Sequence, residues 1–204
     1  MIKYWFSIVG LVLIACVAQQ FVPALPPSLY DAQVLILLLV FLCCTVTTNP
    51  AGMLPLAFLC GFLWDAQNHL GPAGGLLEVY PDPTAVLSFG YSIFLYGAVG
   101  FFMLGIQPFF REGKWHVSAL LSGVAVFLYL LSEYLLINFV RGEFQMTRGV
   151  LLKISITSVL TMFFAPLVFW ILFSLARLFR HTVRYDGLRQ QNQKKSVSDL
   201  LKSA

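Results

Sequence analysis

The run VLILLLVFLCCTVTTNPAGMLPLAFLCGFLW, from Val34 to Trp64, contains no Asp, Glu, Lys or Arg. Asn49-Pro50 divides it into two apolar segments, 34–47 and 51–64, and Pro55 lies within the second. As a helix the second segment would span about 21 Å, whereas the hydrocarbon core of a bilayer is about 30 Å thick. We therefore expect two short or broken membrane helices, with irregular backbone that is buried by neighbouring helices.

The rest of the chain is also strongly apolar. Of its 204 residues 59% are hydrophobic and 11% are charged, and the mean hydropathy is +0.82. An average soluble domain has about 25% charged residues, so lipid must be the solvent for most of this chain. Further apolar segments lie at 4–22, 85–107, 117–139 and 151–178. We expect an all-α integral membrane protein: a six-helix transmembrane bundle in one domain, 1–179, and a basic cytoplasmic tail, 180–204.

The distribution of Lys and Arg predicts the orientation of this bundle. If the N-terminus is cytoplasmic and the chain crosses six times, three of the 13 Lys and Arg residues lie outside and the other ten lie inside. The three outside are Arg141, Arg148 and Lys153. Because positively charged residues gather on the cytoplasmic side of membrane proteins, both termini are expected in the cytoplasm.

Charge and cysteine content argue against several kinds of site. The net charge of +4 sits largely in the last third of the chain, which argues against nucleic-acid binding. All four cysteines lie in apolar runs and are interpreted as buried side chains, not metal ligands: Cys16, Cys43, Cys44 and Cys60. The sequence has no Gly-rich phosphate loop, nucleophile elbow or pair of catalytic acids. We expect no enzymatic activity, no catalytic residue, no metal and no cofactor.

Glu133 is the one carboxylate well inside an apolar run. It lies six residues before Phe139, about 9 Å from the end of that segment along a helix. An ionised carboxylate at this depth is costly unless it is paired. Lys153 enters the next segment from the same side, so a structural Glu133–Lys153 pair is the simplest interpretation. A contact with a partner helix and a proton or ion relay are the alternatives.

Asp65 follows the third apolar segment and begins a stretch rich in Gly and Pro. It is either a solvated helix end or a carboxylate that caps or anchors a loop folding back toward the membrane. Gly61 and Gly71 flank it, and glycine lets backbones approach closely. Pro166 interrupts the last segment and removes the hydrogen bond to the carbonyl of Met162, so we expect a kink there.

The stretch from about Ala51 to Phe179 resembles the MreD family, the small membrane subunit of the bacterial rod-shape machinery. Gly61-Phe-Leu-Trp-Asp65, followed by Leu70-Gly71, is similar to the family's G-x-x-x-D…L-G signature. Two further motifs are similar to the family's basic inner turn and to its closing helix: Phe109-Phe-Arg-Glu-Gly113, and Ser158 through Ala165-Pro166 to Arg177-Leu-Phe179. The loop at 74–84 and the tail are longer than is usual in the family.

The resemblance implies a fold similar to the substrate-binding membrane subunits of vitamin transporters, and a non-enzymatic role in the bacterial cytoplasmic membrane. The implied partner is the bitopic shape protein MreC. Through it come the cell-wall glycosyltransferase–transpeptidase pair and the actin-like filament protein, with membrane lipids around the bundle. The candidate partner-binding or structural residues are Asp65, Gly61, Gly71, Glu133, Lys153 and Pro166.

Two other functions are weighed against this one. A small-solute-binding subunit of a transporter would need several convergent polar groups, and few are present besides Asp65 and Glu133. A membrane enzyme acting on a lipid-linked substrate would need an acid–base or metal cluster, and no such pattern is found in the sequence.

Overall fold

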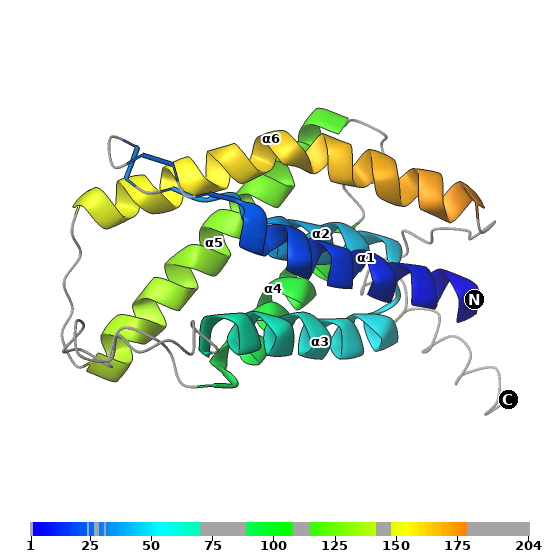
Figure 1. Cartoon of the computed structure of the whole chain (residues 1–204), viewed down its shortest axis with the longest axis horizontal. Helices are drawn as coiled ribbons and strands as arrows, with labels where there is room; N and C mark the ends of the chain where they lie inside the picture. The colour runs from blue at the N-terminus through cyan, green and yellow to red at the C-terminus, as the bar shows by residue number, and fades with distance from the viewer. Residues whose placement is uncertain are drawn as a thin grey trace, which may run out of the picture.

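The computed structural model describes residues 2–23, 25–26, 29–30, 32–69, 89–107, 115–141 and 148–178. This part of the chain contains six α-helices and no β-strand, so the all-α prediction is confirmed for it. The helices shown in Figure 1 are α1 (Ile2–Phe21), α2 (Ile36–Thr47), α3 (Pro50–His69), α4 (Tyr91–Ile106), α5 (Trp115–Arg141) and α6 (Arg148–Leu178).

Three of the described helices are long and apolar enough to cross a membrane. The candidate spans are Tyr4–Phe21 in α1, Val117–Val140 in α5 and Arg148–Leu172 in α6. The apolar helices α2 and α4 are shorter, with 12 and 16 residues. The chain is therefore a membrane protein by the length and composition of its helices. That all six helices cross the bilayer stays a prediction.

α3 is longer and more regular than we expected. It forms one helix of 20 residues that continues through Pro55 and ends at His69, beyond the expected boundary at Trp64. The added residues are held by polar contacts with other elements. Gln67 Nε2 donates to the carbonyl of Cys16 in α1 at 2.6 Å. Gln67, which the sequence placed in the loop after Trp64, thus belongs to the helix, and its side chain bonds a neighbouring helix.

α2 occupies the centre of the bundle. Every residue from Leu37 to Thr47 is buried, and the helix contacts all five of the other described helices. Figure 1 shows it between α1, α3 and α6. At 12 residues it is about 18 Å long, as short as its sequence predicted. Both of its ends therefore lie inside the bundle, where unpaired backbone groups are costly.

The first turn of α2 is capped by side chains from distant helices. Gln19 of α1 accepts from the backbone N–H of Ile36 at 2.6 Å and of Leu37 at 3.3 Å, through the same Oε1 atom. Its Nε2 atom donates to the carbonyl of Val34 at 2.9 Å. The N–H of Leu35 donates to the hydroxyl of Thr161 in α6 at 3.3 Å. One glutamine thus satisfies donors and an acceptor where the chain enters the helix.

The last turn of α2 is satisfied in a similar way. Gln107, directly after α4, donates through Nε2 to the carbonyl of Val46 at 2.8 Å. Thr47 and Thr48 both donate their hydroxyls to the carbonyl of Cys44, at 2.9 and 3.0 Å. Each end of the central helix is therefore bonded by a buried glutamine from another part of the chain.

Gln19→Leu should lower the free energy of unfolding by about 2–4 kcal/mol, because it leaves buried N–H and C=O groups of the α2 entry without partners. The measurement is thermal unfolding of the purified chain in detergent. Gln33→Leu is the matched control, since Gln33 makes one partly buried hydrogen bond to the carbonyl of Val22. Losses of equal size in the two variants would contradict the capping role of Gln19.

Candidate functional site

Asp65 links the end of α3 to the start of α4. Its side chain is 4% exposed, and its Oδ2 atom accepts a hydrogen bond from the N–H of Gly90 at 2.7 Å. Gly90 is the N-cap residue of α4 and has a φ of 105°, a left-handed conformation that favours glycine. A carboxylate at a helix N-terminus is also stabilised by the helix dipole. Of the two interpretations of Asp65, the structure supports a capping carboxylate and not a solvated helix end.

Gly61 allows α3 and α4 to touch one turn below this link. A Cβ atom at Gly61 would lie 2.5 Å from the Cα and 2.7 Å from the backbone nitrogen of Ile93. Contacts this short are not possible, and backbone cannot move aside as a flexible side chain can. The residues of the G-x-x-x-D motif therefore fix the junction of α3 and α4, Gly61 by close approach and Asp65 by a hydrogen bond.

Glu133 does not form the expected pair with Lys153. Lys153 is exposed on α6, whereas Glu133 is half-buried on α5, and no ion pair joins them in the described part of the chain. Asp65, and not Lys153, lies near enough to Glu133 for the two side chains to influence each other's charge. Although α5 and α6 are consecutive in the chain, the Lys153 side chain lies on an exposed side of α6 and does not pair with Glu133.

Two buried tyrosines lie beside the carboxylates. Tyr96 of α4 and Tyr129 of α5 are 0% and 1% exposed, and their rings make an edge-to-face contact with centroids 5.3 Å apart. Both lie within electrostatic range of Asp65 and Glu133. Buried Ser92 lies beside the Tyr129 hydroxyl without reaching hydrogen-bond geometry, and neither tyrosine hydroxyl has a hydrogen-bond partner among the described residues.

We call Asp65, Ser92, Tyr96, Tyr129 and Glu133 the polar cluster. It joins α3, α4 and α5 in the interior of the bundle. Our sequence analysis identified its two carboxylates and missed the other three members. One signal was present: Tyr129 precedes Glu133 by one helical turn and so shares its face. Nothing in the sequence indicated the packing of α4 that brings in Tyr96 and Ser92.

The remaining candidate residues have structural positions or lie outside the described chain. Pro166 is half-buried within α6, which continues as one helix on both sides of it. Gly71, the loop to Thr84, the basic turn at 109–113 and the tail at 180–204 lie outside the described residues.

The described chain places no group of three or more His, Cys, Asp or Glu residues where they could hold a metal ion. The cysteines are buried and free, as their apolar surroundings predicted. Comparison of the chain with profiles of protein families, with curated proteins and with solved structures finds no match.

Gly61→Ala should lower the free energy of unfolding by about 1–3 kcal/mol, because the new methyl group collides with the backbone of α4. Gly97→Ala is the control on α4 itself, where an added Cβ meets no atom within 4 Å. It should be neutral or stabilise by up to about 1 kcal/mol through higher helix propensity. Thermal unfolding in detergent measures both, and equal effects would contradict the close contact at Gly61.

Double-mutant cycles should couple Glu133 to Asp65 and not to Lys153. Glu133→Gln and Asp65→Asn remove the repelling charges while Asn keeps an oxygen for Gly90, so their effects on unfolding should deviate from additivity by more than about 0.5 kcal/mol. Glu133→Gln and Lys153→Met should add within about 0.5 kcal/mol. Coupling in the second cycle and additivity in the first would restore the Glu133–Lys153 pair.

Proposed function

We propose that this protein is a non-enzymatic membrane subunit that holds other membrane proteins in a complex. The observation that carries the proposal is the use of its interior polar side chains. Gln19, Gln107 and Asp65 each bond the backbone at the end of another helix, and Ser158 of α6 donates to the carbonyl of Gly123 in α5 at 2.6 Å. Interior polar side chains that hold helices together favour a rigid assembly platform over a reaction site.

The surface that would receive a partner is an aromatic ladder on α3 and the turn just before α4. Phe58 and Phe62 stack with ring centroids 6.3 Å apart, and Phe62 meets Phe89 edge-to-face at 5.5 Å. These side chains are 58%, 43% and 52% exposed. The ladder stands directly over the junction fixed by Gly61 and Asp65. Rigid, exposed aromatic side chains at a fixed helix junction are good anchors for a partner helix.

The resemblance to MreD supplies the identity of the proposed partner, an MreC-like bitopic shape protein that would lay its single membrane helix on the aromatic ladder. The glycosyltransferase–transpeptidase pair and the actin-like filament protein would join through it. The protein would reside in the bacterial cytoplasmic membrane with six crossings and both termini in the cytoplasm, which the ten-to-three distribution of Lys and Arg supports.

The double variant Phe62→Ala/Phe89→Ala should reduce co-purification of the bitopic partner by about tenfold, because it removes two aromatic anchors. The measurement is the amount of tagged partner recovered with the chain from gently solubilised membranes. Phe163→Ala/Trp170→Ala is the control, since these side chains are 73% and 71% exposed on α6. The same loss in both double variants, or in neither, would contradict docking on the ladder.

The polar cluster favours a second candidate function, a solute-binding subunit of a transporter. Its two carboxylates and three hydroxyls come from three helices, and a small-solute site needs several polar groups of this kind. Under this alternative Tyr129→Phe would weaken solute uptake and leave partner capture unchanged. Under the assembly proposal uptake is absent in the wild type, and only the ladder variants change the composition of the complex.

A further inference from the structure

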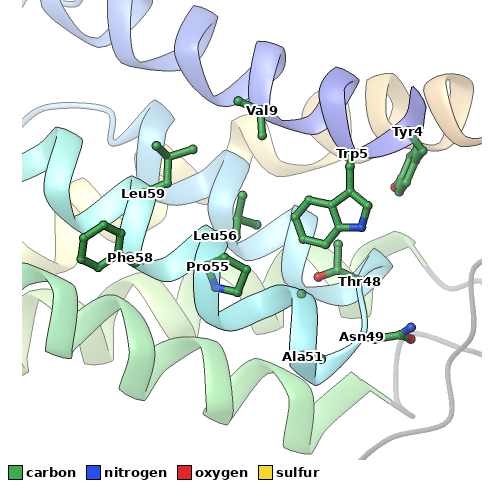
Figure 2. A pocket seen from close by; sticks show the side chains of 11 residues that line it. Tyr4, Trp5, Val9, Thr48, Asn49, Ala51, Pro55, Leu56, Phe58 and Leu59 are labelled. Atoms are coloured by element: carbon green, nitrogen blue, oxygen red, sulfur yellow. The ribbon is translucent and has the colours of Figure 1, made fainter. Parts of the chain in front are cut away.

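A pocket of about 700 Å³ lies between α1 and α3, at the end of the bundle where α2 turns into α3. Figure 2 shows that its lining is divided: Trp5, Thr48 and Asn49 gather at one end, and Val9, Phe58 and Leu59 lie toward the other. Its size falls within the range of about 300–1,000 Å³ that is typical of small-molecule sites. A ligand with one polar end and one apolar end matches this division.

The sequence of α3 leaves one backbone carbonyl of a pocket-lining residue without its regular helical donor. Pro55 lies inside α3 and has no N–H, so it cannot give the carbonyl of Ala51 the hydrogen bond of a regular helix. Ala51 and Pro55 both line the pocket and both are exposed. A carbonyl left in this position at a membrane boundary is best satisfied by a donor from outside the helix.

The residues that line the pocket indicate which polar group a ligand would place at this end. Among the described residues that line the pocket there is no Lys or Arg, so the lining offers no cation to a phosphate group. It offers acceptors instead, the Ala51 carbonyl and the side-chain oxygen of Asn49. A charged donor forms hydrogen bonds about twice as strong as a neutral one, which favours an ammonium group at this end.

We propose that this pocket binds one molecule of phosphatidylethanolamine. Its ammonium group donates to the Ala51 carbonyl and to Asn49, and one acyl chain lies along Val9 and Leu59. Trp5 stands at the level of the headgroup, where tryptophan is enriched in membrane proteins. In the proposed orientation this end of the bundle faces the cytoplasmic leaflet. Phe58 belongs to both the pocket and the aromatic ladder, but the lipid is tested on the chain without its partner, so either proposal can fail without the other.

The headgroup assignment is tested by native mass spectrometry of the full chain. The chain is delipidated in detergent and titrated with dioleoyl phosphatidylethanolamine, or with dioleoyl phosphatidylcholine, whose quaternary ammonium has no N–H to donate. The first lipid should bind about tenfold more tightly, as one charged hydrogen bond predicts. Phosphatidylglycerol is the third arm, and equal binding of it would overturn the ammonium assignment.

Two pairs of variants test the location. Pro55→Ala gives the Ala51 carbonyl a helical N–H and favours the folded helix, so it should weaken the headgroup preference, whereas Pro166→Ala, in α6, should keep it. Leu59→Trp fills the pocket and should abolish retention of the lipid, while Leu167→Trp, at a side chain 56% exposed on α6, should not.

Equal binding of the two dioleoyl lipids by the wild type, or an unchanged preference in Pro55→Ala, would overturn the proposal. Retention of the lipid by Leu59→Trp would overturn the site. So would displacement of the lipid by the membrane helix of a partner, because the pocket would then belong to that helix.

Discussion

The arrangement of this protein depends on a backbone constraint: the central helix α2 begins and ends inside the bundle. A helix of 12 residues cannot carry its free N–H and C=O groups to water on both sides of a bilayer. Those groups must be paired by protein, and Gln19 and Gln107 pair them at the two ends. The positions of α1 and of the end of α4 relative to α2 are fixed by these contacts, and α3, α5 and α6 pack around the helix so defined.

Lipid tails are as apolar as leucine, so burial of apolar surface does little to hold membrane helices together. Close packing and hydrogen bonds between helices take over that role. Ser158 bonds the backbone of α5, and Thr161, one turn further along α6, bonds the chain just before α2. Gly123 provides room for Met162 between them, because a Cβ atom there would lie 3.0 Å from the Met162 sulfur. Gly123, Ser158 and Thr161 thus position α6 against α5 and against the segment that enters α2.

The sequence predicted the number and approximate position of the described helices because apolar length alone decides them in lipid. It could not predict which polar side chains meet. Glu133 and Lys153 are neighbours across one loop, but the rotation of α6 about its axis leaves Lys153 exposed. Asp65 lies near Glu133 because α4 packs against both α3 and α5. The end of α3 was misjudged for a related reason, since Gln67 is stabilised by α1 and not by residues near it in sequence.

α3 shows how one helix can serve different purposes along its length. It begins with Pro50, whose missing N–H costs nothing in a first turn, and the carbonyl of Asn49 accepts from Gly52 and Met53 to start the helix. Pro55 then removes the regular helical donor of the Ala51 carbonyl. Gly61 permits contact with α4, and Asp65 caps that helix. Of these four positions, only Gly61 and Asp65 contact α4, the next helix in the chain. The aromatic ladder beside this junction is exposed, and the close contact at Gly61 fixes the helix that carries Phe58 and Phe62.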